Sequence, residues 1–321
     1  MLNRTVCIAP MMGYTDRHAR YFLRLISKHA LLYTEMVTTG ALMHGDRKKL
    51  LRYHADELPL AIQLGGSDPV ELAECSRIAE DAGFSEVNLN VGCPSDRVQS
   101  RRIGACLMAH PQRVADAVAA MRSAVKLPVT IKCRTGIDHM EAYADLNRFI
   151  ETVAAAGCDG FIVHARKAWL QGLSPKQNRE IPPLKYDYVY RLKRQHPQLN
   201  IVINGGIKTL DQVHVHLQHV DGVMLGREAY HNPYLLAQVD RDFFGEAADA
   251  QRSRDEVMAA FIDYAEAQLA AGECLHRMSR HLHGLYKNVQ GSKAWKRHLS
   301  EHAHKQGAGI QVLQQARRLT H

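Results

Sequence analysis

Short apolar runs alternate with helical patterns along most of this chain, from its first residues to about residue 244. The runs at residues 60–64, 129–134 and 201–204 are rich in Val, Ile and Leu, which is typical of strands buried on both faces. About eight such runs occur, and nearly all are followed by a helical segment. This repetition predicts an α/β fold of the (β/α)8 TIM barrel type rather than an open doubly wound sheet.

The alternation of strands and helices stops near residue 244. Residues 245–254 are small and polar, which predicts a linker, and the residues that follow show only helical spacing. Met278, Leu282 and Leu285 recur at that spacing and predict the buried side of a small helical bundle. We therefore predict two domains, a barrel over residues 1–244 and a helical bundle over residues 245–321.

Basic residues outnumber acidic residues, and the surplus is concentrated near the C-terminus. The formal net charge is +8, and after residue 250 there are 11 Lys and Arg against 6 Asp and Glu. Lys293, Lys296 and Arg297 belong to this basic segment. The pattern favours a polyanionic partner, and a helical bundle with a solvated basic face is the alternative interpretation.

The cysteines and the apolar segments bear on where the protein resides. Seven cysteines are scattered singly without a C-x-x-C spacing, which indicates neither a disulfide framework nor a zinc ribbon. The sequence contains no basic segment leading into a long apolar leader, and no run of about 18 apolar residues. These features predict a cytoplasmic protein without a membrane segment, and a monomer is the expected oligomeric state.

Cys93 follows a predicted strand that carries polar residues on one face. Asn88 and Asn90 alternate with apolar residues in the run 86–91, and Cys93 comes next, between a glycine and a proline. A free thiol is mostly protonated at neutral pH and can donate a proton to carbon. No histidine lies near Cys93 in the sequence to make it a nucleophile. The alternative interpretation of Cys93 is a small buried residue that packs as a hydrophobic side chain.

Polar or flexible side chains occur at the ends of nearly all the predicted strands. The C-terminal ends of barrel strands face a common pocket, so these residues are expected to converge. They are Met12, Gln63, Asn90 with Cys93, Lys132, His164, Asn204 and Arg227. Gln63 and Asn204 could instead satisfy loop backbone, and His164 could be a hydrogen-bonded core residue. A buried Lys132 is harder to explain without an anionic partner.

Two glycine-containing segments predict a phosphate site. Asn204-Gly205-Gly206 follows the seventh strand and Gly226-Arg227 follows the eighth, the two loops that commonly bind phosphate in these barrels. Neither a dinucleotide fingerprint nor a P-loop is present, and the spacing of the His residues does not predict a metal site. A flat phosphorylated cofactor such as flavin mononucleotide (FMN) suits these residues, with Lys132 as the cation beside the reduced ring.

The sequence resembles the tRNA-dihydrouridine synthases over essentially its whole length, and their A subfamily most closely. The resemblance lies in residues 9–12 with 15–17, 31–36, 63–66, 88–95, 104–108, 164–167 and 172–176. It implies an FMN-bound barrel with a C-terminal helical domain. The implied reaction is reduction of the C5=C6 bond of uridine in the tRNA D-loop, at U20 and U20a, with NADPH as the reductant.

The resemblance also assigns roles to individual residues. It implies that Cys93 is the proton donor. The positions that match FMN contacts are Pro10, Met11, Met12, Gln63, Lys132, His164, Asn204, Gly205, Gly206, Gly226 and Arg227. Those associated with tRNA are Asn90, Lys176, Arg179, Lys293 and Lys296. In the loop beyond Cys93 the chain departs from the family pattern, with Arg101 and Ile103 in place of Gly and Phe.

Two other functions are compatible with parts of this pattern. One is a flavin reductase of a free pyrimidine or another small unsaturated substrate, which would have no use for the basic C-terminal segment. The other is a tRNA-binding factor without catalysis, which would have no need of Cys93, Lys132, His164 and Arg227 together.

Overall fold

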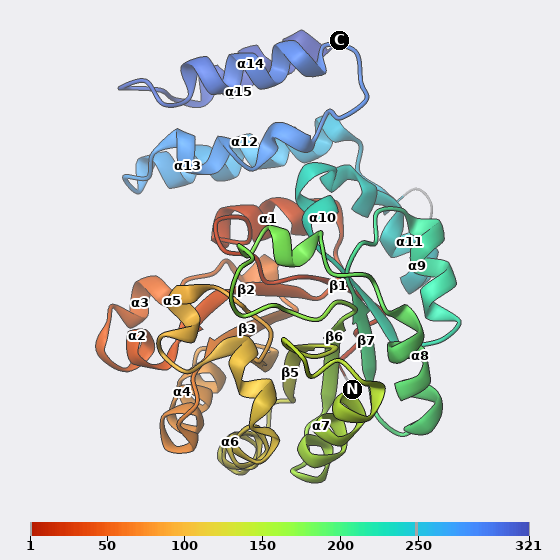
Figure 1. Ribbon diagram of the computed structural model, residues 1–321. Helices are drawn as coiled ribbons and strands as arrows, with labels where there is room; N and C mark the ends of the chain where they lie inside the picture. The colour runs from red at the N-terminus through yellow and green to blue at the C-terminus, as the bar shows by residue number, and fades with distance from the viewer. Residues whose placement is uncertain (1, 248–249, 321) are drawn as a thin grey trace. The chain divides into compact units, whose positions relative to one another are not determined.

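The protein is described by a computed structural model that covers residues 2–247 and 250–320 (Figure 1). Its internal contacts divide the chain into two compact units. The first comprises Met1–Met12 and Leu31–Gly226, and the second comprises Gly13–Ala30 and Arg227–His321. The sequence-based boundary after residue 244, with FMN binding before it and tRNA binding after it, stays a prediction. Residues 248 and 249 of the predicted linker lie outside the described ranges.

The first unit contains eight parallel strands in the order β1-β8-β7-β6-β5-β4-β3-β2. They are β1 (Val6–Ile8), β2 (Leu32–Thr38), β3 (Leu60–Gly65), β4 (Glu86–Asn90), β5 (Val129–Arg134), β6 (Gly160–His164), β7 (Ile201–Asn204) and β8 (Gly222–Leu225). β1 pairs with β8, and a bridge between Cys7 and Leu31 brings β1 against the start of β2. The predicted (β/α)8 barrel is therefore confirmed.

Helices cover the outside of the strands in this unit (Figure 1). They are α2 (Thr39–His44), α3 (Arg47–Leu50), α4 (Pro69–Asp81), α5 (Asp96–Gln99), α6 (Pro111–Ala124), α7 (Tyr143–Ala155), α8 (Tyr186–Gln195) and α9 (Leu210–Leu217). α4 shows how the local sequence starts such a helix. The Asp68 side chain accepts from the backbone N–H groups of Val70 and Glu71, and Pro69 occupies the first turn, where no donor is needed.

The barrel interior is apolar near the starts of most strands, apart from Glu86 on β4 and Thr130 on β5, and it is polar near the strand ends. Cys7, Leu31, Ala61, Ile162 and Val202 are fully buried in one cluster inside the barrel. Side chains alternate across a strand, so residues two positions further on point the same way. The polar residues predicted at the strand ends are therefore the inward-facing continuation of this core.

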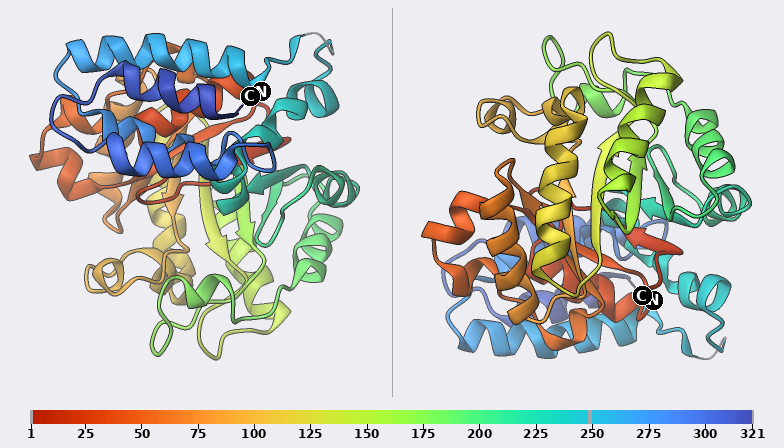
Figure 2. Two further views of the ribbon diagram at one scale, coloured as in Figure 1. Left: turned by 90° about the horizontal axis from the view of Figure 1, so that it is seen from above. Right: turned by 90° about the horizontal axis from the view of Figure 1, so that it is seen from below.

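The second unit is entirely helical among the residues that the structure describes. It contains α1 (Arg17–Ile26), α10 (Arg227–His231), α11 (Val239–Phe244), α12 (Arg254–Ala270), α13 (Leu275–Ser279), α14 (Ser292–His302) and α15 (Ile310–Arg317). The helices near the C-terminus run side by side in both views of Figure 2. Tyr21 of α1 stacks on Tyr264 of α12 with ring centroids 3.9 Å apart, and Trp295 is fully buried. The participation of α1 in this unit was not anticipated from the sequence.

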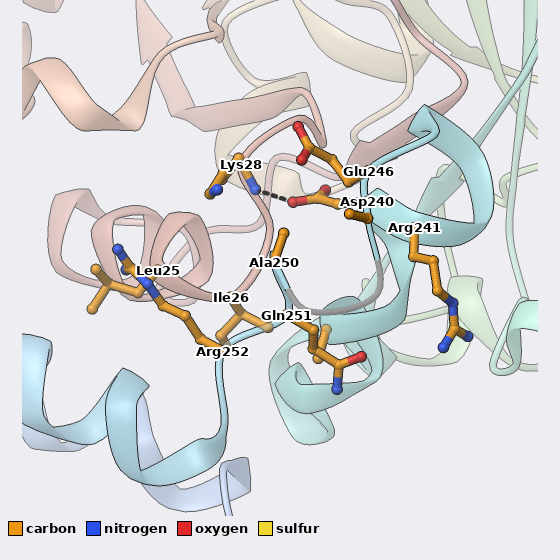
Figure 3. Close-up of a pocket in the computed structure, with 11 residues that line it drawn as sticks. Leu25, Ile26, Lys28, Asp240, Arg241, Glu246, Ala250, Gln251 and Arg252 are labelled. Atoms are coloured by element: carbon orange, nitrogen blue, oxygen red, sulfur yellow. Dashed lines mark hydrogen bonds between the residues drawn. The ribbon is translucent and has the colours of Figure 1, made fainter.

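A small hollow beside α1 in this unit lies where α1 and α11 are held together (Figure 3). Asp240 accepts hydrogen bonds from Ser27 Oγ at 2.5 Å and from the backbone N–H of Lys28 at 2.6 Å, so it ties the end of α1 to α11. The free volume is about 10 Å³, which is room for one water molecule at most. Across the described ranges, no helix combines the length and apolar character needed to cross a membrane.

Candidate active site at the strand ends

The backbone around Cys93 is held from two sides just beyond β4. The side-chain oxygen of Asn90 accepts hydrogen bonds from the backbone N–H groups of Gly92 at 3.1 Å and Cys93 at 3.0 Å. Gly104 has a φ of +79°, and a Cβ there would lie 2.5 Å from the Cys93 carbonyl oxygen, so this close approach requires glycine. Cys93 itself is half-buried, and its Sγ donates to Ser95 Oγ at 3.6 Å. The loop is thus constrained while the cysteine is partly exposed.

The departures from the family pattern beyond Cys93 do not strain this loop. The left-handed residue is Arg102, with φ +56°, and Arg101 is an exposed neighbour. Ile103 is 5% exposed and so fills a core position. Arg101 therefore does not occupy a position that needs glycine.

Gln63 and Asn90 meet beneath this loop. Gln63 lies on β3, in register with Asn88 of β4, and is 1% exposed. Its side-chain oxygen accepts from Asn90 Nδ2 at 2.8 Å, and its Nε2 donates to Asn88 Oδ1 at 2.8 Å. The alternative interpretation of Gln63 as a group that only satisfies loop backbone is therefore wrong, because it bonds to two side chains inside the barrel.

Lys132 and Asn204 meet across the strand ends. Lys132 on β5 is in register with Asn90 of β4, and its Nζ donates to Asn204 Oδ1 at 3.0 Å. Asn204 Nδ2 donates to the carbonyl of Met224, which fixes the orientation of the amide. Burial, and then the charge of Arg134, lower the pKa of Lys132 to about 8. None of the carboxylates in residues 2–247 and 250–320 pairs with this ammonium group.

His164 lies among cations at the end of β6. Its Nδ1 is buried and has no hydrogen-bond partner among the described residues. Burial, followed by the charges of Arg134 and Lys132, lowers its pKa well below the usual range, so the imidazole is neutral at pH 7. A neutral histidine can either donate or accept, and an unpaired ring nitrogen in a buried site indicates a missing ligand atom.

Arg134 completes this cationic cluster and did not stand out in the sequence. It is 5% exposed and donates from Nε to the carbonyl of Gly92 at 2.8 Å and from Nη1 to the carbonyls of Lys167 and Asn178 at 3.1 Å. Burial, and then nearby arginines, lower its pKa to about 10. The signal available in the sequence is its spacing, because it continues the inward face of β5 two residues beyond Lys132.

The two glycine segments lie after β7 and β8, as predicted. Gly205 and Gly206 have φ values of +114° and +75°, a region that side-chain-bearing residues rarely adopt. A Cβ on Gly205 would lie 3.3 Å from His164 Cε1, so the backbone passes close to the site. Gly226 follows β8 directly and Arg227 is the first residue of α10. Pro10, Met11 and Met12 follow β1, and Met12 is 66% exposed.

These residues fit the expected flavin. The unpaired His164 Nδ1 requires a hydrogen-bond partner of either kind, and the ammonium group of Lys132 requires acceptors. A flavin ring offers carbonyl oxygens and ring nitrogens, and its phosphate suits backbone N–H groups in a glycine turn. The chemistry of the donor set therefore matches an anionic, flat cofactor.

The residues associated with tRNA fall into two groups. Lys176 and Arg179 are exposed on the insertion between β6 and α8 in the first unit. Lys293 and Lys296 are exposed on α14 in the second unit, three residues apart and hence on one face of the helix. The fifth residue, Asn90, lies in the barrel at the Cys93 loop.

A basic hollow of about 240 Å³ adjoins α14 in the second unit. Arg280, His283, Lys287 and Lys296 are among the residues that line it. Lys287 pairs with Glu228 at 2.9 Å. Arg280 is exposed. No cluster of three or more potential metal ligands occurs within the described part of the chain.

Comparison with known proteins gives consistent matches over nearly the whole chain. Residues 7–320 match the family described as dihydrouridine synthase. A Shewanella oneidensis protein named tRNA-dihydrouridine(20/20a) synthase is 60% identical over 315 residues, which are 98% of this chain and 93% of the relative. Proteins of the same name from Vibrio cholerae and Escherichia coli K12 are 55% and 56% identical, over 96% and 97% of this chain and 94% and 90% of the relatives.

Proposed function

The chain belongs to the dihydrouridine synthase family, and from this we propose that it reduces the C5=C6 bond of uridine in tRNA to 5,6-dihydrouridine at positions 20 and 20a. The positions come from the names of its relatives. The observation that carries the proposal is the half-buried Cys93, whose backbone N–H is held by Asn90 at a strand end beside the cationic cluster. A thiol and unpaired cations in one site suit a reduction in which hydride and proton arrive separately.

The family is flavin-dependent, and we propose FMN as the bound cofactor and NADPH as its reductant. When bound, reduced FMN would supply the hydride. Lys132, His164 and Gln63 would hold the ring, because each is a polar side chain near the end of a barrel strand. Gly205, Gly206 and Arg227 would hold the phosphate. Pro10, Met11, Met12, Asn204 and Gly226 complete the proposed cofactor site.

Cys93 is the proposed acid. Its thiol gives a proton to one carbon of the double bond while hydride reaches the other, so the uracil ring gains two hydrogens and the thiolate is left to be reprotonated. Arg134 holds the carbonyl of Gly92 and Asn90 holds the N–H of Cys93, so both flanks of the acid are positioned.

The target uridine must leave the base stack before it can reach a site inside a barrel. That extrusion costs a few kcal/mol, which phosphate contacts elsewhere can offset. Lys176, Arg179, Lys293 and Lys296 are exposed cations, and we assign such contacts to them. A monomer acting in the cytoplasm, where tRNA is processed, completes the proposal.

The proposed function is tested by one experiment on purified protein. The protein is expected to show flavin absorption bands that bleach when NADPH is added without oxygen. The bands should return on addition of tRNA that lacks dihydrouridine, with dihydrouridine appearing at positions 20 and 20a. Return of the bands with free uridine in place of tRNA would favour the alternative of a small-substrate flavin reductase. A protein that remains colourless after FMN is supplied would refute the cofactor assignment.

Exchange of both Lys293 and Lys296 for glutamate is expected to weaken tRNA binding at least tenfold at about 0.1 M salt, because two attractive interactions with phosphate become repulsive. The slope of log affinity against log salt should fall by about 0.7–0.9 for each lysine–phosphate pair that is removed, while flavin content stays normal. The measurement is a tRNA titration at several salt concentrations.

A matched control for this double variant replaces two other basic residues by glutamate, so that the net charge changes by the same amount. Lys126 and Arg194 are exposed and precede β5 and β7, so they lie at the strand starts, where barrels do not place their sites. Glutamate at both positions should leave tRNA affinity close to that of the unchanged protein. An equal decrease of affinity in the two double variants would show a general charge effect and remove the role assigned to α14.

A further inference from the structure

Beneath the Cys93 loop, the barrel interior contains an unbroken chain of hydrogen-bonded side chains. We call it the interior polar chain, and it consists of Glu86, Thr130, Asn88, Gln63 and Asn90. Starting from the carboxylate, the donor-to-acceptor distances are 2.5 Å from Thr130 to Glu86, 2.9 Å from Asn88 to Thr130, 2.8 Å from Gln63 to Asn88 and 2.8 Å from Asn90 to Gln63. The last link is the N–H of Cys93, which donates to Asn90 at 3.0 Å.

Strand register explains why these five side chains meet. Gln63 of β3 is paired with Asn88 of β4, and Asn88 is paired with Thr130 of β5. Glu86, Asn88 and Asn90 are two residues apart on β4 and therefore share its inward face. All five are at most 9% exposed. Each link of the chain is thus set by the pairing of three neighbouring strands.

The end of the interior polar chain that lies farther from Cys93 is a buried ion pair. Arg4 donates from Nε to Glu86 at 2.7 Å, and Tyr33 donates its hydroxyl to the same carboxylate at 2.8 Å. Both Arg4 and Glu86 are buried, so the ionised carboxylate is compensated by a guanidinium group and two hydroxyl donors. A carboxylate paired in this way can only accept hydrogen bonds.

The two ends together fix the direction of every link. The Glu86 carboxylate accepts only, and the backbone N–H groups of Gly92 and Cys93 donate only. With an acceptor at one end and donors at the other, each amide has one orientation that satisfies both of its neighbours. Turning over the Asn90 amide would place its NH2 group against two N–H donors and its oxygen against the oxygen of Gln63.

We propose that Thr130 and Asn88 are positioning residues for the reaction, although the chain separates them from the thiol. They hold the Asn90 amide in a single orientation, and this amide in turn holds the backbone of Cys93 so that its thiol is aligned for proton transfer. The expected effect on kcat rests on the proposed function. The direction of the hydrogen bonds in the interior polar chain does not depend on that function.

Exchange of Thr130 for valine tests the chain with little change of shape. Valine keeps the volume but has no hydroxyl, so Asn88 loses an acceptor and Glu86 loses a donor. We expect kcat to fall about tenfold because a misplaced acid transfers its proton poorly, with KM for tRNA within about twofold. Thr130→Ser keeps the hydroxyl and should restore kcat.

Backbone hydrogen exchange gives a readout that does not depend on activity. In Thr130→Val the amides of Gly92 and Cys93 should exchange about tenfold faster than in the unchanged protein and in Thr130→Ser, because their acceptor is no longer held. Unchanged exchange together with unchanged kcat would overturn the proposal. A decrease of kcat that serine fails to restore would also overturn it.

A second variant, Asn88→Asp, covers the case in which the valine variant does not fold. A protonated carboxyl can donate to Thr130 and accept from Gln63, so it preserves the hydrogen bonds of the interior polar chain. An ionised carboxyl has no donor, and its oxygen would face the Thr130 oxygen, whose hydrogen is committed to Glu86. The kcat of this variant should therefore decline as pH rises through the pKa of the introduced carboxyl.

Asn3→Asp is the matched control, because Asn3 is exposed and does not belong to the interior polar chain. Identical pH profiles for Asn88→Asp and Asn3→Asp would contradict the proposal. If the unchanged protein makes no dihydrouridine, the proposed function fails by itself, and hydrogen exchange at Gly92 and Cys93 still decides whether Thr130 positions the loop.

Discussion

Replacing Cys93 by alanine is expected to lower kcat for dihydrouridine formation by about 10²–10⁴-fold, the usual contribution of a positioned general acid. Methyl has no proton to give, and Asn90 and Arg134 would still hold the loop through backbone atoms that alanine retains. Binding of FMN and its reduction by NADPH should therefore continue at the rate of the unchanged protein. Only the half-reaction with tRNA should slow.

Stopped-flow absorption separates these two half-reactions. Bleaching of the flavin by NADPH reports the first, and its return with tRNA lacking dihydrouridine reports the second. Cys106→Ala is the matched control, since Cys106 is also half-buried in the segment after Cys93 but donates to the carbonyl of Ile103. Full turnover by Cys93→Ala would show that another group is the acid.

Replacing Lys132 by methionine is expected to lower kcat by about 10²–10³-fold, as removal of one preorganised electrostatic group does in other enzymes. Methionine has a similar length without the charge. FMN binding should weaken, and the reduction potential of the bound flavin should become more negative, because the ammonium group favours the anionic reduced form. Fluorescence titration of FMN and a redox titration measure the two effects.

Lys126→Met provides the control for this variant, because Lys126 is exposed just before β5 whereas Lys132 lies near the end of that strand. It should bind FMN normally and turn over at the normal rate. An unchanged potential in Lys132→Met would remove the role assigned to the ammonium group.

The lowered pKa of Lys132 also predicts a change in stability with pH. Burial brings the pKa from 10.5 in an exposed lysine to about 8 in the folded protein without ligand. The unfolded chain therefore binds this proton more tightly, and the Lys132 contribution to the free energy of unfolding rises between pH 8 and 10.5. Lys132→Met should remove that rise and, without FMN, be the more stable protein below pH 8. Chemical denaturation across this range provides the measurement.

The barrel could be predicted from the sequence because its signals are local. Apolar runs that alternate with helical patterns identify the strands, and the polar residue at each strand end follows directly in the chain. Since a barrel brings all its strand ends to one face, counting strands was enough to place Gln63, Lys132, His164 and Asn204 near one another. Of these four residues, Lys132 and Asn204 are joined directly by a hydrogen bond, and Gln63 bonds to Asn90 at the end of the neighbouring strand. Their shared role in one site stays a prediction.

Arg134 and the interior polar chain could not be predicted in the same way. Thr130 has no unusual local pattern, and although the alternation around Asn88 marks a polar strand face, the hydrogen bond between the two residues depends on the register between β4 and β5. Likewise, α1 follows the first strand as any barrel helix would, yet its aromatic residues pack with α12 in the second unit. Sequence spacing does not specify which distant element covers a helix face.

The strand and helix periods can be read from the sequence, and so can the chemical character of each strand end and the basic C-terminal segment, because these are properties of neighbouring residues. Which polar groups pair and which remain unpaired is set by the folded barrel. That outcome depends on strand register and burial, which are shared by residues far apart in the chain. The unpaired His164 Nδ1, the lowered pKa of Lys132 and the single orientation of the Asn90 amide are all of this second kind.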